Sequence, residues 1–465
     1  MKGNTDPPFA MVNENGNEND GSIAEPLGRR SVFFYGVGHM LNDITSACWF
    51  TYLLLFLTDI GLSPRDAAIV MLSGQVADGF ATVFSGELID RFGHFKIWHF
   101  GGTVLVAISF SSVFGGCLLC KILGIDSLTM QTIGYSIFAA IFNVGWAATQ
   151  VSHMSMVNCM TSNSTSRVAL ASCRNAFTMV ANLTLYAIAL VVFSLDHAKT
   201  AVNIENQYRM IAYSAIFIGC CFVGIFLIGT KEPSLKRQSL CLNYTKISWA
   251  HWFKKLLYYQ VALVYMLTRL VTNVSQALLA FYVINDLQMN QSSKALVPAI
   301  IYISSFFVSV ILQEIKWTGW RLKIFFTAGA VLWIFSGAGI FILPSNLHNF
   351  MYLLSVTTGV ANALMTVTGI SMESILVGED LDGCAFVYGS LSFLDKISCG
   401  IALYILESYQ DSVTGCHDIR GCQSLTRYGS GLIPAVCAFL GALVTYTIDI
   451  HETSVKKTLA EPLLA

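Results

Sequence analysis

Ionisable and polar residues lie at helical spacing inside otherwise apolar stretches of this chain. His39 and Asp43 are four residues apart, with Asn42 beside them, so one helical face would carry the imidazole and the carboxylate together. A carboxylate can hold a cation or exchange a proton, and a guanidinium or ammonium can bind an anion. These residue types indicate that the site recognises a charged small molecule, exchanges a proton, or does both. The other members of the set are Gln75, Asp78, Thr82, Arg174, Arg269, Asn273, Gln276, Asp395 and Lys396.

The composition indicates where these residues must lie. Apolar residues make up 54% of the 465 positions and charged residues only 12%, against roughly 25% charged residues in an ordinary globular domain. A soluble core could not hide so much apolar surface, whereas a bilayer can. The net charge of −1 argues against a nucleic-acid partner. Because the chain has no P-loop and no zinc-spaced cysteine cluster, we expect no enzyme activity, no cofactor and no metal.

Twelve apolar stretches are each long enough for a membrane span, which needs about 20 residues of helix. Six stretches precede a polar, basic gap and six follow it. We therefore predict an all-α membrane protein of about 12 transmembrane helices in two six-helix halves. The boundaries that we expect are a disordered cytosolic tail at 1–30, an N-terminal half at 31–229, a basic cytosolic linker at 230–255, a C-terminal half at 256–449 and a cytosolic tail at 450–465.

Lysine and arginine are distributed unevenly between the two sides of the membrane. The side that holds both tails and the linker carries seventeen, the opposite side carries seven, and three lie within spans. Positive loops remain in the cytosol, so both termini are expected there. On the opposite side, Cys416 and Cys422 could form a disulfide in an oxidising compartment, and Asn290 begins a glycosylation sequon. A loop with free thiols and an unused sequon is the alternative.

The acids and bases within the spans balance each other, three against three. Each ionisable side chain in a bilayer costs about 2.5–3.5 kcal/mol on insertion scales, so it normally faces a partner or a water-filled cavity. One interpretation is structural, with ion pairs that only hold helices in register. Because the residues are spread over both halves, we favour a solvated central cavity. Lys396 could reach Asp43 or Asp78 across the interface between the halves, in a salt bridge that a solute or cation breaks.

The loop between the second and third spans carries a specific pattern. Residues 86–96 fit G-x-x-x-D-R-x-G-x-x-K, the cytosolic signature of the major facilitator superfamily. The absence of a side chain at its first glycine would let a neighbouring helix approach closely, and its aspartate could cap a helix N-terminus in the other half. Such a latch would close a cytosolic gate. An ordinary basic loop would explain the charges but not the glycines. The gate residues are Gly86, Asp90, Arg91, Gly93 and Lys96.

The chain resembles the glycoside–pentoside–hexuronide cation symporter branch of that superfamily, through residues 35–43 and the residues around Asp78 and Lys396. The resemblance implies that Asp43 contacts substrate, that Asp78 belongs to a cation site, and that Lys396 is the lysine of the eleventh helix. Two differences weaken the case for sodium coupling and a glycoside cargo. A second cation-site acid is replaced by Thr82, and the fourth span has Trp146 and Gln150 but no acid.

A resemblance over nearly the whole chain is to the eukaryotic family called major facilitator superfamily domain-containing protein 12. Its most specific segment is 385–396, which contains Tyr388, Asp395 and Lys396. This resemblance implies cysteine or a similar amino acid as cargo and a lysosome- or vacuole-like organelle as the location.

From these observations we predict an alternating-access secondary transporter of a small polar organic solute in a lysosomal or vacuolar membrane. Its expected partners are the lipid bilayer, the solute and a coupling proton. A zwitterionic amino acid offers an ammonium to Asp43 and a carboxylate to Arg269, and arginine suits carboxylate recognition. The expected solute-binding residues are Asp43, Asn42, His39, Arg269, Asn273, Trp146, Gln150 and Tyr388. The expected coupling residues are Asp78, Asp395 and Lys396.

Three alternative functions remain open at this point. A sugar–cation symporter would need substitutes for the missing acids, and sugars would compete for its uptake. A lysolipid carrier would need a long apolar path between helices, and lysolipids would compete. A membrane receptor that does not transport would bind a ligand without net flux, which would leave the gate signature without a purpose.

Overall fold

Twelve helices of the computed structural model are long and apolar enough to cross a membrane. The structure describes residues 27–92, 94–125, 127–161, 164–195, 201–232, 252–313, 315, 318–377, 384–413 and 425–449, and these residues contain no strand. The predicted all-α fold and the number of spans are confirmed. The C-terminal tail and most of the N-terminal tail and of the linker fall outside the described residues, and the first helix begins at Arg29, two residues before the expected start of the N-terminal half.

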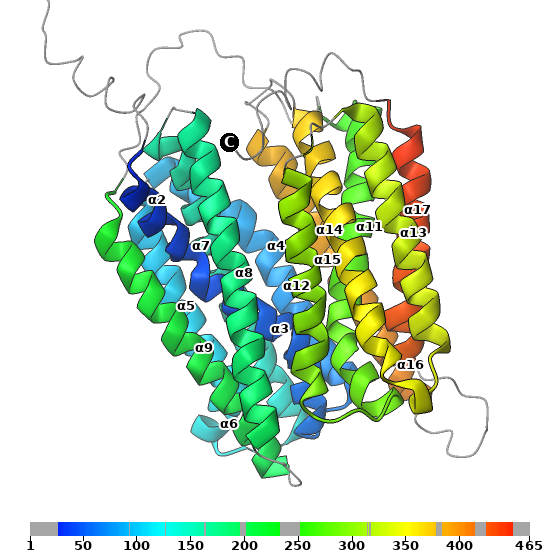
Figure 1. Ribbon diagram of the computed structural model, residues 1–465. Coiled ribbons are helices and arrows are strands. Elements are labelled where there is room, and N and C mark those ends of the chain that lie inside the picture. The colour runs from blue at the N-terminus through cyan, green and yellow to red at the C-terminus, as the bar shows by residue number, and fades with distance from the viewer. Residues whose placement is uncertain are drawn as a thin grey trace, which may run out of the picture.

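Two groups of six spans form bundles that lie side by side (Figure 1). The first is built from α2 (Arg29–Gly36), η2 (Val37–His39) and α3 (Met40–Asp59), then α4 (Pro64–Phe92), α5 (Phe95–Phe114), α7 (Leu128–Met160), α8 (Ser164–Leu195) and α9 (Ala201–Gly229). The second is built from α11 (Leu256–Phe281) with η3 (Tyr282–Asp286), α12 (Ser293–Gln313), α13 (Gly319–Ile342), α14 (Phe350–Val377), α15 (Cys384–Val413), and α16 (Leu425–Arg427) with η6 (Tyr428–Leu432) and α17 (Ile433–Thr447).

The start of α2 and the end of α17 lie at the same end of the molecule (Figure 1). We call this end the terminal face and the other end the opposite face. Large apolar side chains cover the outside of the bundles, and Ile228, for example, is 89% exposed. Such a surface suits lipid, where helices also satisfy every backbone polar group internally. The charged residues of the sequence must therefore be positioned between the helices.

The first span is interrupted close to the residues that could do chemistry. The short 3₁₀ turn Val37–His39 separates α2 from α3, and helix breaks in a membrane need partners for the freed carbonyl groups. Nε2 of His153 donates to the carbonyl of Tyr35 at 2.9 Å, and Nε2 of His99 donates to the carbonyl of Gly38 at 3.1 Å. The break is thus stabilised by two histidines from α7 and α5, and it positions the start of α3.

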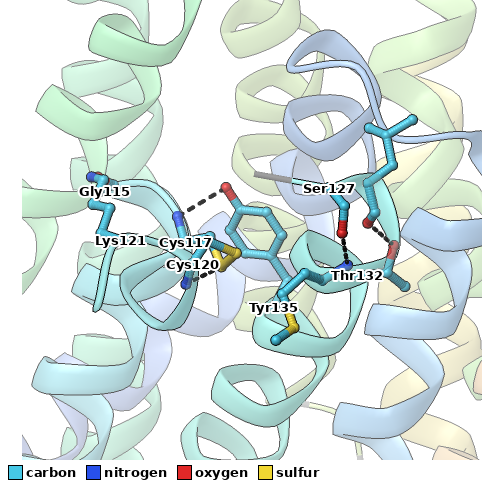
Figure 2. Close-up of a disulfide and its surroundings, with 9 residues drawn as sticks. Gly115, Cys117, Cys120, Lys121, Ser127, Thr132 and Tyr135 are labelled. Carbon is cyan, nitrogen blue, oxygen red and sulfur yellow. Dashed lines mark hydrogen bonds between the residues drawn. A yellow bond between two sulfur atoms is a disulfide. The ribbon is translucent and has the colours of Figure 1, made fainter. Parts of the chain in front are cut away.

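A disulfide loop lies on the opposite face, between α5 and α7. Gly116 has a φ of 90°, a left-handed conformation that favours glycine, and turns the chain into α6 (Leu118–Leu123). Cys117 and Cys120 form a disulfide, and the backbone N–H of Cys117 donates to the Tyr135 hydroxyl at 3.2 Å (Figure 2). The sequence analysis did not find this pair, because both cysteines extend an apolar run. The expected pair Cys416–Cys422 lies outside the described residues.

The Cys117–Cys120 disulfide predicts that the opposite face meets an oxidising compartment, because disulfides are rare in the cytosol. We expect that a variant keeping only these two cysteines, once denatured, reacts with a maleimide only after reduction. A matched variant that keeps only Cys173, a free thiol near the terminal face, should react with and without reductant. Labelling of the Cys117/Cys120 variant before reduction would contradict the prediction.

Candidate functional site

Asp43, the acid of the first span, belongs to a hydrogen-bonded cluster in the N-terminal half. Nδ1 of His39 is 2.9 Å from Oδ1 of Asp43, and the Thr178 hydroxyl of α8 donates to Oδ2 at 2.8 Å. Nη2 of Arg174 is 3.5 Å from Nε2 of His39. Arginine can only donate, so Nε2 accepts and the proton of the neutral ring sits on Nδ1, which donates to Asp43.

Arg174 is incompletely satisfied in this cluster. Within the described residues the long contact to His39 is the only hydrogen bond of its side chain, and its Nε is buried without a partner. A buried donor without an acceptor costs about 1–3 kcal/mol, and more when it is charged. Asp43, by contrast, has both oxygens hydrogen-bonded and a side chain that is 10% exposed. The cluster therefore places a guanidinium that can bind an anion next to a carboxylate that can bind a cation.

A reciprocal pair of hydrogen bonds joins α3 to α7 next to Asp43. Nδ2 of Asn42 donates to the Trp146 carbonyl at 2.9 Å, and Nε1 of Trp146 donates to the Asn42 carbonyl at 3.2 Å. Asn42 is fully buried, and its Oδ1 has no hydrogen-bond partner among the described residues, so in this conformation its amide N–H positions Trp146. Gln150 lies about one turn after Trp146 in α7, half-buried, and makes no hydrogen bond with the described residues.

In the C-terminal half, Asp395 of α15 accepts hydrogen bonds from two residues of α11. Nε of Arg269 donates to Oδ2 of Asp395 at 3.0 Å, and Nδ2 of Asn273 is 3.4 Å from Oδ1. The thiol of Cys399, which the sequence analysis missed, donates to Oδ1 at 3.3 Å. Asp395 is buried, but the Arg269 side chain is 38% exposed. An arginine in the middle of a span avoids lipid, so this exposure indicates contact with water between the helices.

A salt bridge connects the two halves. Nζ of Lys396 in α15 lies 2.6 Å from Oδ1 of Asp78 in α4, and it donates to the Thr82 hydroxyl at 3.1 Å. The same ammonium is 5.1 Å from the centroid of the Trp146 ring, within range of a cation–π interaction. Of the two partners expected for Lys396, the structure pairs it with Asp78 and not with Asp43. Lys396 reaches the Asp43 cluster only through Trp146.

Other contacts between the halves lie nearer the opposite face. Nε2 of Gln276 donates to the Thr51 hydroxyl at 3.0 Å, and the Tyr52 hydroxyl donates to the Lys294 carbonyl at 3.2 Å. Lys294 lies in the first turn of α12, and its buried Nζ donates to the Tyr208 hydroxyl at 3.2 Å. In the described part of the chain, the hydrogen bonds between the halves lie from the Asp78–Lys396 level to the opposite face. The bundles diverge toward the terminal face (Figure 1).

The gate signature is only partly described. A Cβ placed on Gly86 would meet only Cγ1 of Val151, at 4.0 Å, so the close helix approach expected there does not occur in this conformation. Nζ of Lys96 donates to the Thr230 carbonyl at 2.8 Å, which joins α5 to the end of α9 within one half. A cation suits a helix C-terminus. Outside the described part of the chain lie the side chains of Asp90, Arg91 and Tyr388, and the whole of Gly93.

Comparisons with known proteins agree with this architecture. Residues 34–452 match the family described as MFS/sugar transport protein. The chain is 33% identical to the human major facilitator superfamily domain-containing protein 12 over 82% of this chain and 85% of that protein. It is 31% identical to the horse protein of the same name, over 92% and 94%. Among solved structures, a D-xylose–proton symporter superposes with a TM-score of 0.70 at 15% identity, covering 92% of this chain and 99% of the other. A nucleoside transporter superposes with a TM-score of 0.63 at 13% identity, covering 89% and 99%.

Proposed function

The chain belongs to the MFS/sugar transport protein family and is a multi-pass membrane transporter, and from this premise we propose that its cargo is a zwitterionic amino acid, with cysteine as the first candidate. The observation that carries the proposal is the Asp43 cluster, where a carboxylate lies beside the incompletely satisfied Arg174. A zwitterion supplies a carboxylate for the incompletely satisfied arginine and an ammonium that the charge of Asp43 can attract.

Two arginines, Arg269 and Arg174, are candidates to bind the cargo carboxylate. Arg269, which the sequence favoured, projects from α11, and α11 packs against α3, the helix of Asp43. Its Nε donates to Asp395, whereas the rest of its partly exposed guanidinium makes no hydrogen bond with the residues that the structure describes. Arg174 is linked to Asp43 through His39. We assign the ammonium to Asp43 and the carboxylate to these arginines, because both can donate to it without losing an existing acid partner.

The Asp78–Lys396 bridge supports alternating access as the mechanism. It links α4 of one half to α15 of the other at 2.6 Å, so the halves cannot separate at that level without breaking it. A cation or proton that neutralises Asp78 would weaken the bridge. We therefore propose Asp78 and Lys396 as the coupling pair, with Asp395 acting through its bond to Arg269. The lysosome-like membrane and the cytosolic position of the terminal face rest on the family resemblance and on the distribution of basic residues.

Labelled cysteine uptake into organelles or proteoliposomes with and without the protein tests the proposal. We expect uptake that requires the protein and that excess unlabelled cysteine abolishes, with little inhibition by D-xylose or lysolipid. A sugar cargo is the second candidate, because one protein of similar fold is a D-xylose–proton symporter. Inhibition by sugars but not amino acids would replace the amino-acid proposal with the sugar one. Specific binding without flux would favour a receptor.

A further inference from the structure

Three buried histidines form a row that begins at Asp43. The ring centroids of His39 and His153 are 5.4 Å apart, and those of His153 and His99 are 5.8 Å apart. All three side chains are almost completely buried. His99 lies in the second turn of α5, which begins at the terminal face, so the row extends from Asp43 toward that face.

The hydrogen bonds fix which ring nitrogens carry protons in the neutral rings. Nε2 of His153 and Nε2 of His99 each face a backbone carbonyl, and a carbonyl can only accept, so each Nε2 carries a proton. Nδ1 of each neutral ring therefore holds a lone pair. Both Nδ1 atoms are buried and have no hydrogen-bond partner among the described residues. If these histidines only satisfied the carbonyl groups of the broken helix, an N–H donor would be enough. The buried Nδ1 acceptor would then have no role.

Each of these two rings can take up a proton without losing its structural hydrogen bond. Protonation at Nδ1 leaves the Nε2–H bond to the α2–η2 break in place, so the ring can stabilise the break and titrate. The fold thus provides three acceptor positions, which are Nδ1 of His153, Nδ1 of His99 and Nε2 of His39. Charged rings less than 6 Å apart would repel one another, so the row accommodates one proton at a time.

The charged and titratable groups around the row link its proton to the solute. Asp43 on α3 bonds to His39 and is the counter-ion for a proton in the row. Arg174 on α8 donates to Nε2 of His39 and opposes a proton there. Tyr35 on α2 stacks on His153 with a centroid distance of 4.1 Å, and from α9 the row meets the uncharged Phe226. A solute carboxylate that draws Arg174 away would free Nε2 of His39 to accept the proton.

We propose that His39, His153 and His99 form a one-proton binding site that couples proton movement to solute binding at Asp43 and Arg174. The proposal deepens the proposed function, on which its solute step rests. A proton enters from water, binds one lone pair of the row, and leaves as H⁺ when the charge of the solute is withdrawn. No bond other than N–H forms or breaks.

His153→Gln separates coupling from structure. Glutamine keeps an N–H donor for the Tyr35 carbonyl but cannot titrate. With a gradient of one pH unit, we expect the ratio of gradient-driven cysteine accumulation to cysteine exchange at equal pH to fall by about tenfold, the factor that corresponds to one pH unit of lost driving force. His99→Gln should behave in the same way. His348→Gln changes a partly exposed histidine outside the row, near the opposite face, and should not change this ratio.

Wild-type pH dependence and accumulation in both His153→Gln and His99→Gln would overturn the proposal. A parallel loss of exchange and accumulation, with normal protein levels, would also overturn it in favour of a structural role. A second measurement needs no cargo. In purified protein with ¹⁵N-labelled histidine, the three rings should follow one shared one-proton titration, whereas independent curves or no titration would refute the site. Absence of cysteine uptake by wild type, with the shared titration intact, would instead refute only the proposed cargo.

Discussion

Asp43→Asn is expected to lower the initial rate of cysteine uptake by about 10- to 100-fold at an unchanged protein level. The substitution keeps the size of the side chain and a hydrogen-bond acceptor for Thr178, but it removes the negative charge that faces His39 and the cargo ammonium. A hydrogen bond to a charged group contributes about 1.5–3 kcal/mol, and each 1.36 kcal/mol corresponds to about tenfold. The measurement is uptake of labelled cysteine at several concentrations, normalised to transporter in the membrane.

Thr178→Val is the matched control for this prediction. It removes the hydroxyl that donates to Oδ2 of Asp43 at 2.8 Å and leaves the charge in place. The variant loses one donor to the carboxylate but keeps the charge that attracts the ammonium, so uptake should fall by less than in Asp43→Asn. If Asp43→Asn transports cysteine as well as wild type does, or if Thr178→Val is the more damaging change, Asp43 does not bind the cargo.

The fold was predictable because its signals are local. Each span is an apolar stretch of sufficient length, and exposed apolar residues such as Ile228 need only lipid. The balanced acids and bases also predicted that charges would pair between helices. Even the bridge from Lys396 to the second span was a named possibility, because an ammonium on a long side chain can reach an acid in a neighbouring helix.

The choice of partners was not predictable, because it depends on contacts between residues far apart in sequence. Whether Lys396 meets Asp43 or Asp78 is decided by the packing of α4 against α15. His99 and His153 come from two different helices and meet only because both bond to carbonyls at the break in the first span. A single histidine in an apolar helix is more often a packing residue, so nothing local distinguished these two.

Burial also depends on contacts that position in the sequence does not show. Lys294 follows a turn and reads as a loop residue, yet its ammonium lies 4.3 Å from the centroid of the Phe193 ring in the other half. Asn42 neighbours Asp43 in sequence, but successive helical residues point about 100° apart, and its amide turns to the backbone of α7. In both cases the neighbouring helix decides what the side chain contacts.

Asp78→Asn is expected to cause the largest loss of folded transporter among the substitutions considered. It leaves the Lys396 ammonium buried without its counter-ion, and removing one partner of a buried ion pair costs about 3–5 kcal/mol. This is a large part of the 5–15 kcal/mol that typically stabilises a folded protein. The measurement is the amount of monodisperse protein and its melting temperature. Glu205→Gln is the matched control, because the Glu205–Arg209 pair is partly exposed near the opposite face, where ion pairs contribute about 0–1 kcal/mol.

The double variant Asp78→Asn/Lys396→Met then separates stability from transport. Replacing both members of a buried pair is often neutral or stabilising, so we expect protein level and melting temperature to recover to within a few degrees of wild type. Transport should not recover, because the halves no longer share a contact that charge neutralisation can release. If the double variant transports cysteine with an unchanged response to a pH gradient, the bridge only joins α4 to α15. If it folds normally and does not transport, the 2.6 Å contact is required for the switch between conformations.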